Sequence, residues 1–482
     1  MEHIDYAGSR SWNRSSYFSA SLNKLTLVLF DFLAFALAAS FAQILSSQEL
    51  FFWQYSDLRW QVSSYYVVAL GAMVWFWGNQ RHYSHRKPFW DELKEIFSTL
   101  AVATMLALCI NAIFVKNYSL NLWSMQWATV FITLPVLRNL AKALLNKLGV
   151  WAMPCVIIGD AQNAKDALNA INSEPSTGFD VQAIVLPSDE SKAKPINGIP
   201  TLSKAEFLAR SHEFYKVFIA LEKHENCLRD SWIRQLSKIG LLNISVVPAL
   251  RGIPLYGTDI SNFFSHEVMM LRIKNNLNRR SSRMVKRLFD IVASAVLLLL
   301  LSPVFAYIGW KVSRDGGSAT YGHERIGLNG KKFKCLKFRS MVMNSKEVLE
   351  NLMANDPEAR AEWEKEFKLK NDPRITPIGQ LLRKTSLDEL PQLWNVFKGE
   401  MSLVGPRPVI DEELLRYGED VLYYNLAKPG MSGLWQVSGR SDTDYDTRVY
   451  LDSWYVKNWS LWYDIVILFK TVGVVLKRKG AY

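Results

Sequence analysis

The chain has 482 residues, of which 49% are hydrophobic, and its formal net charge is +12. This length excludes a single compact core and predicts two or three domains. The 17 Trp residues and the 13% aromatic content indicate membrane contact, because aromatic side chains concentrate at membrane interfaces. Residues 271–340 hold 15 Lys and Arg against three Asp and Glu, a basic stretch that suits nucleic acid, anionic lipid or a phosphate-bearing substrate.

Four apolar runs precede residue 140, at Leu25–Leu45, Val62–Gly78, Ile96–Val115 and Ser119–Leu137. Each approaches the roughly 20 residues that span a bilayer. Basic residues gather before the first run, after the second and after the fourth, so the positive-inside rule places those segments in the cytoplasm. We therefore expect a four-helix transmembrane bundle over residues 1–150, with a soluble helical bundle as the alternative. Asp31 lies within the first run, and we expect it to lie between helices or near the interface.

Residues 151–250 change pattern and predict a small Rossmann-like α/β domain. The stretch "CVIIGDAQNAKDALNAI" reads as a strand, a glycine turn and a helix, and "FDVQAIV" and "KVFIAL" read as further strands. Only Gly159 is present where a dinucleotide fingerprint needs three glycines. We therefore expect a structural, oligomerising or regulatory role, followed by a linker over residues 251–281.

A further apolar run extends from Lys286 to Arg314 and is interrupted by Ser302 and Pro303. Proline removes a backbone donor and kinks a helix. Both flanks of the run are basic, so a straight span would place one basic flank outside the cytoplasm. The sequence predicts a re-entrant membrane helix over residues 286–312, kinked at Ser302 and Pro303. The alternative is a kinked span, which would put the rest of the chain outside.

Two adjacent carboxylates, Asp388 and Glu389, lie in "KTSLDELPQLWNVFKGEMSLVGPRP". Nearby cations are expected to lower both pKa values and keep the pair ionised. An ionised Asp can attack phosphorus, and carboxylates can hold Mg²⁺ together with substrate phosphates. The alternative is a helix start in which Ser386 and Glu389 form a capping box, and both interpretations can hold together.

Candidate phosphate-binding residues surround this pair in the sequence. Guanidinium groups suit phosphate oxygens because they donate two parallel hydrogen bonds. The candidate substrate-binding residues are Lys337, Arg339, Arg383, Arg407, Gln436 and Arg440.

The last apolar stretch, Leu461–Leu476, is interrupted by Asp464 and Lys470 and follows Trp454 and Trp459. This pattern favours an amphipathic helix in the membrane interface over a transmembrane span. The alternative is a core helix of the soluble lobe.

Residues 282–482 resemble the bacterial sugar transferase family, the monotopic polyprenyl-phosphate phosphoglycosyl transferases. The resemblance rests on "KFRSM", "TSLDELPQLWNV", "KGEMSLVGPRP" and "KPGMSGLWQVSGR". It implies an α/β monotopic transferase domain with a re-entrant helix. It also implies a ping-pong mechanism in which Asp388 becomes covalently attached to a phosphosugar, while Glu389, with Asp388, binds Mg²⁺.

The same resemblance implies the substrates and the location. We expect transfer of a hexose 1-phosphate from a UDP-sugar to undecaprenyl phosphate with release of UMP, as the first membrane step of O-antigen or other polysaccharide synthesis. Galactose is the expected sugar, glucose the alternative and an N-acetylated sugar the third choice. The expected location is the bacterial inner membrane, with the catalytic domain on the cytoplasmic face. Expected partners are membrane lipid and, as a further candidate, a second copy of the chain, but not nucleic acid.

Two other classes of function remain as alternatives. A membrane nucleotide-sugar dehydratase would need a Tyr-x-x-x-Lys motif on a helix, and the motif from Tyr83 to Lys87 lies in a short loop between two apolar runs. A non-enzymatic membrane sensor would leave the acidic pair and its cations unexplained.

Overall fold

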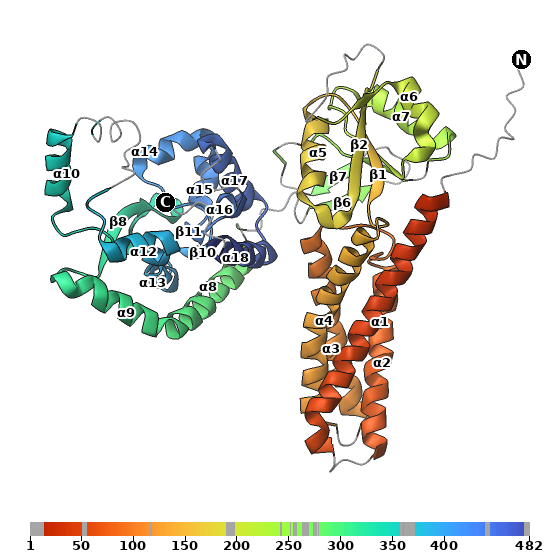
Figure 1. The fold of residues 1–482 in the computed structure, drawn as a ribbon, viewed down its shortest axis with the longest axis horizontal. Coiled ribbons are helices and arrows are strands. Elements are labelled where there is room, and N and C mark those ends of the chain that lie inside the picture. The colour runs from red at the N-terminus through yellow and green to blue at the C-terminus, as the bar shows by residue number, and fades with distance from the viewer. Residues whose placement is uncertain are drawn as a thin grey trace, which may run out of the picture. The chain divides into compact units, whose positions relative to one another are not determined.

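The computed structural model describes residues 14–50, 55–115, 118–188, 198–241, 243–250, 252–253, 258–262, 269–272, 277, 279–356, 360, 372–438 and 444–476. The chain forms two compact units, Met1–Arg251 and Gly252–Tyr482. The first unit contains a helical bundle followed by an α/β domain, and the second is a separate mixed fold (Figure 1).

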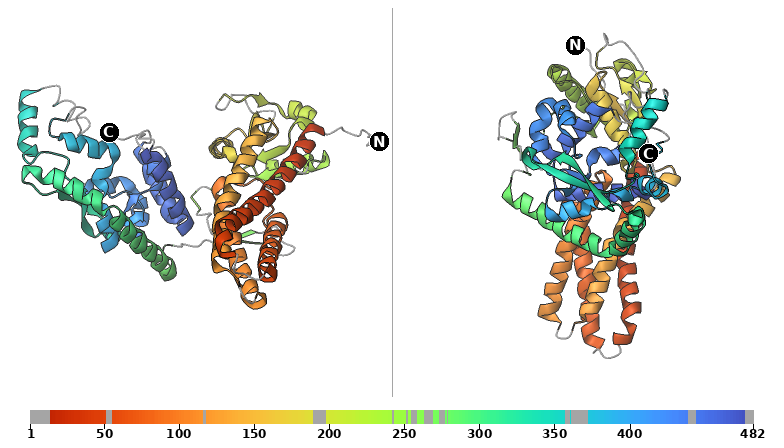
Figure 2. Two further views of the ribbon diagram at one scale, coloured as in Figure 1. Left: turned by 60° about the horizontal axis from the view of Figure 1, so that its bottom comes forward. Right: turned by 90° about the vertical axis from the view of Figure 1, so that its left-hand side faces the viewer.

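Four long helices form the bundle: α1 (Arg14–Leu50), α2 (Tyr55–Gly78), α3 (Phe89–Phe114) and α4 (Leu120–Lys147). They run side by side, as Figure 1 and the right-hand view of Figure 2 show, and Phe35, Tyr65, Leu100 and Trp127 belong to their shared core. Among the described residues, α1, α3 and α4 are long and apolar enough to cross a membrane. The prediction of apolar helices near the N-terminus is therefore confirmed.

The α/β domain is built on a five-stranded parallel sheet. Its elements are β1 (Met153–Ile158), α5 (Gln162–Ser173), β2 (Phe179–Val185), β3 (Thr201–Leu202), α6 (Lys204–Arg210), β4 (Lys216–Ile219), α7 (Asn226–Lys238) and β5 (Ile244–Val246). The strand order is β3-β2-β1-β4-β5, and every neighbouring pair is parallel. This order is that of a doubly wound Rossmann-like sheet, so the predicted α/β domain is confirmed.

The single glycine of the first strand-helix turn has a structural reason. Gly159 has a φ of +149°, and a Cβ there would lie 2.5 Å from the carbonyl oxygen of Ala220. Glycine is therefore needed for close packing against the end of β4.

The second unit contains short strands and many helices. They are β6 (Asp259–Asn262), β7 (Met269–Arg272), α8 (Arg280–Leu300), α9 (Ser302–Val312), β8 (Thr320–Ile326), β9 (Lys332–Phe338), α10 (Ser345–Asn355), α12 (Pro377–Thr385), α13 (Gln392–Lys398), β10 (Ser402–Val404), α14 (Asp411–Leu414), α15 (Val421–Leu426), β11 (Gly430–Ser432), α16 (Leu434–Ser438), α17 (Tyr445–Lys457) and α18 (Leu461–Leu476). The strands pair as antiparallel β6–β7 and β8–β9 and as parallel β10–β11. The hairpin β6–β7 lies within residues 251–281, which the sequence suggested as a linker.

Helices α8 and α9 meet at a bend of 63°. Pro303 occupies the first turn of α9, and the hydroxyl of Ser302 donates to the carbonyl oxygen of Leu299 at 2.8 Å. The predicted interruption at Ser302 and Pro303 is therefore confirmed as a bend between two helices. Large apolar side chains are exposed along both helices: Met284, Val285, Leu288, Val292, Val296, Leu297, Leu299, Leu300, Val304, Tyr307 and Trp310.

A buried ion pair joins α8 to α18. The Nζ of Lys286 lies 2.7 Å from Oδ2 of Asp464, and it also donates to the carbonyl oxygen of Val404 at 3.0 Å. The hydroxyl of Tyr455 and Nε1 of Trp459 donate to the same carboxylate at 2.6 and 3.0 Å. Two helices far apart in the sequence are thus fixed to β10 and α17.

The prediction of an interfacial C-terminal helix is wrong for one face of α18. Asp464 is 0% exposed and Trp459 is 4% exposed, and both lie in the interior beside Val466 and Ile467. Asp464 does not interrupt the apolar run toward solvent, because Lys286 pairs with it inside the core. The core-helix alternative describes this face, whereas Phe469 remains exposed.

Candidate active site

The acidic pair lies on a short 3₁₀ turn, η6 (Leu387–Glu389), between α12 and α13. Ser386 precedes it with a φ of +57°, a left-handed conformation that is unusual for a residue other than glycine. The side chain of Ser386 makes no capping hydrogen bond, so the capping-box alternative is wrong. Glu389 instead directs its carboxylate to a lysine on β9.

Lys337 is the cation that contacts the acidic pair. Its Nζ lies 2.7 Å from Oε1 of Glu389 and 3.9 Å from Oδ2 of Asp388. Burial alone would lower the pKa of Lys337, but Glu389 and Asp388 raise it above its ordinary value. Lys337 therefore stays charged and keeps a positive centre beside both carboxylates.

The pKa of Asp388 moves in the direction opposite to the one predicted. Burial raises it above its ordinary value, and this effect outweighs the opposing charges of Lys337 and Arg383. The sequence suggested the reverse because it showed the cations but not the burial. A carboxylate with a raised pKa is more basic, which makes it a stronger nucleophile.

A buried amide positions Lys337 beside the pair. Asn395 on α13 is 1% exposed. Its Oδ1 accepts from the backbone N–H of Leu336 at 3.0 Å, and its Nδ2 donates to the carbonyl oxygen of Lys334 at 2.8 Å. The helix that follows the acidic pair is therefore fixed to the strand that carries Lys337. No local sequence pattern predicts this role, because the partners of Asn395 are about 60 residues away.

The structure places the other candidate cations in different surroundings. Arg383 lies in the last turn of α12, and its Nε donates to the hydroxyl of Ser340 at 3.0 Å. Arg339 is bound to the α9–β8 connection, where it pairs with Asp315 and donates to the carbonyl oxygen of Ser318. Arg383 thus acts electrostatically on Asp388, while Arg339 holds the end of α9.

The remaining candidates belong to the C-terminal motifs. The guanidinium of Arg407 lies 5.4 Å from the ring centre of Trp435, and Gln436 is the next residue on α16. Arg440 lies outside the described residues. Roles in substrate binding for Lys337, Arg339, Arg383, Arg407, Gln436 and Arg440 stay predictions.

The acidic turn packs directly onto the bent helix pair. Leu387 and Leu390, which flank Asp388 and Glu389, contact a core formed by Ile308 and Val312 of α9 with Phe338 and Leu382. The opposite side of α9 exposes apolar side chains such as Trp310. Asp388 is therefore attached through two leucines to α9, a helix whose other side exposes apolar side chains.

Magnesium would have few protein ligands at this turn. Among the described residues, no group of three or more potential metal ligands occurs. The side chains of Asp388 and Glu389 are 15% and 33% exposed, so their oxygens are accessible to a ligand. Two hard oxygen donors fit Mg²⁺, which binds proteins through one or two carboxylates and takes substrate phosphates and water as its other ligands.

Asp452 on α17 is a buried acid that the sequence did not single out. It is 2% exposed, and its Oδ2 accepts from the hydroxyl of Tyr417 at 2.9 Å and from the backbone N–H of Arg407 at 3.3 Å. Its Oδ1 has no partner in the part of the chain that the structure describes. Burial raises the pKa of Asp452 to about 7. This carboxyl supports the turn that carries Arg407.

Replacing Asp452 by Asn is expected to flatten the pH dependence of stability. The folded state holds the proton more tightly than the unfolded chain, whose carboxyl has an ordinary pKa of 3.8, so stability falls as pH rises from 3.8 to about 7. Asn cannot ionise and can still accept both hydrogen bonds, so Asp452→Asn should stabilise the protein above pH 7 by up to about 4 kcal/mol. Heat-unfolding midpoints against pH measure this, with the exposed Asp446→Asn of the same helix as control. Parallel pH profiles for Asp452→Asn and the wild type would contradict it.

Comparisons with known proteins place this site in a family. Residues 281–478 match the model of a family described as bacterial sugar transferase, and residues 79–238 match one described as CoA-binding domain. The chain is 51% identical over 477 residues to "Undecaprenyl-phosphate galactose phosphotransferase" of Salmonella typhimurium, covering 98% of this chain and 100% of that one.

Two further relatives differ in the share of this chain that they match or in the sugar that their names give. "Exopolysaccharide production protein ExoY" of Rhizobium meliloti is 54% identical over 200 residues, which cover 41% of this chain and 88% of that protein. "UDP-glucose:undecaprenyl-phosphate glucose-1-phosphate transferase" of Escherichia coli is 29% identical over 391 residues, which cover 75% of this chain and 77% of that protein.

Proposed function

The chain belongs to the bacterial sugar transferase family, and from this premise we propose that it transfers galactose 1-phosphate from UDP-galactose to undecaprenyl phosphate, releasing UMP. The observation that carries the proposal is the 51% identity, over 98% of the chain, to a relative named for this activity. Glucose is the second candidate, since a relative at 29% identity is named for glucose 1-phosphate transfer. The difference in identity favours galactose. The resulting lipid-linked sugar would begin O-antigen or other polysaccharide synthesis.

In the proposed mechanism, Asp388 is the nucleophile. Its carboxylate attacks the β-phosphorus of the UDP-sugar, a new acyl–phosphate bond forms, and the bond to the UMP oxygen breaks. A phosphate oxygen of undecaprenyl phosphate then attacks the same phosphorus, which forms the lipid diphosphosugar and returns the free carboxylate. The raised pKa of Asp388 supports this role, because a more basic carboxylate attacks more readily.

Lys337 and the second carboxylate have supporting roles. Lys337 lies 3.9 Å from Asp388, so its charge can stabilise the negative charge that builds on the phosphoryl oxygens. Asp388 and Glu389 would hold Mg²⁺, which supplies charge neutralisation at the diphosphate when bound. Arg383, Arg407, Gln436 and Arg440 remain candidates for holding the nucleotide and the lipid phosphate.

The proposal requires a water-soluble nucleotide and a lipid phosphate to meet at one depth. We propose that α8 and α9 enter the membrane and return, so that the exposed apolar side chains of both helices contact acyl chains. Because Leu387 and Leu390 pack on α9, Asp388 would then lie at headgroup level. With the helices α1–α4 as a transmembrane bundle, the proposed arrangement would put the transferase domain, residues 282–482, on the cytoplasmic face of the inner membrane.

The location of the transferase domain can be tested by cysteine labelling. The exposed native cysteines, Cys109 and Cys227, are first replaced by Ser. Lys331→Cys, between β8 and β9, is then expected to react only with membrane-permeant reagents in intact cells, because both flanks of the helix pair would face the cytoplasm. Leu120→Cys, at the start of α4 and 56% exposed, is the control that should react from outside. Reaction of Lys331→Cys with an impermeant reagent would contradict the re-entrant topology.

The reaction itself is tested by UMP release from the purified full-length protein. UDP-galactose, UDP-glucose and UDP-N-acetylglucosamine are compared with and without undecaprenyl phosphate. We expect repeated UMP release with UDP-galactose and the lipid, and no more than one UMP per enzyme without the lipid. If UMP release were fastest with UDP-glucose, glucose would replace galactose as the proposed sugar, and the proposed reaction would stand. No UMP release with any of the three would reject the proposed function.

A dehydratase finds no support in the first unit. The hydroxyl of Tyr83 donates to Oδ2 of the fully buried Asp31 at 2.6 Å, and Nζ of Lys87 lies 2.5 Å from Oε2 of Glu95. The Tyr and Lys of the motif therefore serve contacts at the end of the helical bundle.

A further inference from the structure

The first unit contains a cavity that the proposed reaction does not use. It lies where the end of the helical bundle meets the α/β domain, and it is lined by residues of α1, of the loop between α2 and α3, of α3, of α4 and of the α/β domain. Asn23 and Lys24 come from α1, Arg86 from the loop and Ser176 from the α/β domain. Asn23 and Lys24 lie outside residues 79–238, the range of the second family match.

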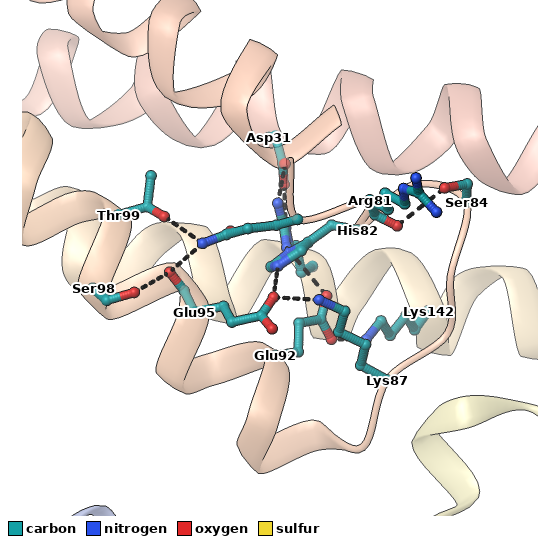
Figure 3. A network of polar contacts seen from close by, with 12 residues as sticks. Asp31, Arg81, His82, Ser84, Lys87, Glu92, Glu95, Ser98, Thr99 and Lys142 are labelled. Atoms are coloured by element: carbon teal, nitrogen blue, oxygen red, sulfur yellow. Dashed lines mark hydrogen bonds and ion pairs between the residues drawn. The ribbon is translucent and has the colours of Figure 1, made fainter. Parts of the chain in front are cut away.

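Two of the lysines at the cavity already have acidic partners. Figure 3 shows Lys87 beside Glu95 and Lys142 beside Glu92, and both contacts are ion pairs. These pairs belong to a larger polar network in which Arg138 joins Asp31, Glu92 and His82. The charges of Lys87 and Lys142 are therefore balanced within the bundle.

Arg86 is held rigidly but has no acidic partner among the described residues. Its guanidinium lies 4.1 Å from the ring centre of Trp151, and its Nη1 donates to the carbonyl oxygens of Thr177 and Gly178 at 2.8 and 3.0 Å. Gly178 has a φ of +64°, and a Cβ there would lie 2.4 Å from Nη1 of Arg86. Burial lowers the pKa of Arg86 to about 10. This value is still well above neutral pH, so the guanidinium keeps its positive charge without a counterion.

Other cations reinforce the positive potential. Lys24, exposed on α1, forms no ion pair within the described chain. Burial and four nearby cations lower the pKa of His85, and the cations are Arg81, Lys216, Lys87 and Lys24. One carboxylate, that of Glu92, lines the cavity, and it is paired with Arg138 and Lys142. An anion entering the cavity would therefore meet a positive field.

Three side chains that line the cavity carry polar atoms without partners among the described residues. They are Oδ1 of Asn23, Nη2 of Arg86 and Oγ of Ser176. Asn23 is 5% exposed and uses its Nδ2 on the carbonyl oxygen of Val150, so its Oδ1 is left as a buried acceptor. Unpaired buried polar atoms are rare in folded proteins and call for a ligand or ordered water. Two donors, one acceptor and an unbalanced charge match the monoanion of a phosphate monoester, which offers two anionic oxygens together with one P–OH group.

We propose that this cavity binds a phosphate monoester, with Arg86 and Lys24 as its cationic contacts and Asn23 and Ser176 as its neutral contacts. The ligand can be a soluble phosphate ester or a lipid headgroup, because the cavity opens at the end of the apolar helices. The bound ligand would connect α1 to the α/β domain. The stability of the first unit would then depend on the concentration of the phosphate monoester.

Ligand-induced heat stabilisation of the full-length protein tests the proposal. The soluble arm uses inorganic phosphate, compared with chloride at equal ionic strength. The lipid arm uses nanodiscs that contain phosphatidic acid, compared with phosphatidylglycerol, a phosphate diester of the same sign. The variants are Arg86→Gln and Lys24→Gln, and the control is Lys147→Gln, which removes one exposed cation from α4 of the same unit.

We expect a saturable rise in the unfolding midpoint in at least one arm. Loss of one charged contact should weaken binding by roughly tenfold in each variant, but not in Lys147→Gln. A response only to phosphatidic acid would identify the ligand as a lipid, and a response to inorganic phosphate would identify a soluble ester. Because Lys24 is exposed, Lys24→Gln remains informative if Arg86→Gln fails to fold. No response in either arm, or equal responses in wild type, Lys24→Gln and Lys147→Gln, would overturn the proposal. The readout here is the unfolding midpoint and not UMP release, so the result of this experiment is independent of the test of the transferase activity.

Discussion

Replacing Asp388 by Asn is expected to reduce UMP release by more than about 10³-fold, the scale seen when a catalytic nucleophile is removed. Asn has nearly the same shape, so the packing of Leu387 and Leu390 on α9 should survive. It lacks the anion that attacks phosphorus, so no covalent phosphosugar should form. UMP release and mass analysis of the digested protein after incubation with UDP-galactose measure the two effects.

The control is Asp411→Asn, which removes an exposed carboxylate from the same unit. Asp411 is paired with Lys332 at 2.7 Å and lies on α14 rather than on the acidic turn. It should retain activity near that of the wild type. A phosphosugar adduct on the Asp388→Asn protein would assign the nucleophile elsewhere. An adduct mapped to the peptide that contains Asp388 in the wild type would support the assignment directly.

As the pH is lowered, the wild-type enzyme should lose activity sooner, that is at a higher pH, than an enzyme whose catalytic carboxyl has the ordinary pKa of 3.8. The attacking form of Asp388 is the anion, and its pKa is raised above 3.8 by burial. Activity is therefore expected to rise with pH through that raised value. Any activity that the Asp388→Asn protein retains should not show this rise with pH, because the amide of Asn does not ionise at these pH values.

Local sequence patterns were enough for the parts of the site that lie close together in the chain. Asp388 and Glu389 are adjacent, and Ser302 and Pro303 are next to the bend that they form. In the first unit, apolar runs likewise predicted the membrane helices, and alternating strand and helix patterns predicted the α/β domain. In each case the physical cause, a proline without a donor or a continuous apolar face, acts within a few residues.

The contacts that assemble the site could not be predicted in this way. Lys337 and Glu389 are 52 residues apart, and the amide of Asn395 reaches β9 across about 60 residues. The same limit explains the wrong sign for the pKa of Asp388. Cations are visible in the sequence, whereas the desolvation that outweighs them depends on the folded packing around the acidic turn.

Asp464 was wrongly predicted to lie on an interfacial helix face, because its buried partner could not be seen in the sequence. In the sequence this residue interrupts an apolar run, which suggested a helix that faces lipid and water. In the structure its partner Lys286 lies 178 residues away, and the pair is almost fully buried. Neither charge is therefore free to reach solvent when the other is removed.

Replacing Lys286 by Met is expected to destabilise the transferase unit by about 3–5 kcal/mol. The substitution leaves Asp464 inside the core with hydrogen bonds only from Tyr455 and Trp459, which do not balance its charge. The carbonyl oxygen of Val404 loses the Nζ donor as well. Heat-unfolding midpoints and resistance to limited proteolysis measure the effect, and Lys311→Met, an exposed position on α9, is the matched control.

A double variant separates the cost of the unpaired charge from the loss of packing. In Lys286→Met with Asp464→Leu, no buried charge remains, and apolar replacements of a buried ion pair are often neutral or stabilising. Much of the lost stability should therefore return, even though Tyr455 and Trp459 lose their acceptor. If Lys286→Met alone unfolds at the wild-type temperature, Lys286 and Asp464 are not paired in the folded protein, and the joining of α8 to α18 must depend on apolar contacts such as those of Ile467.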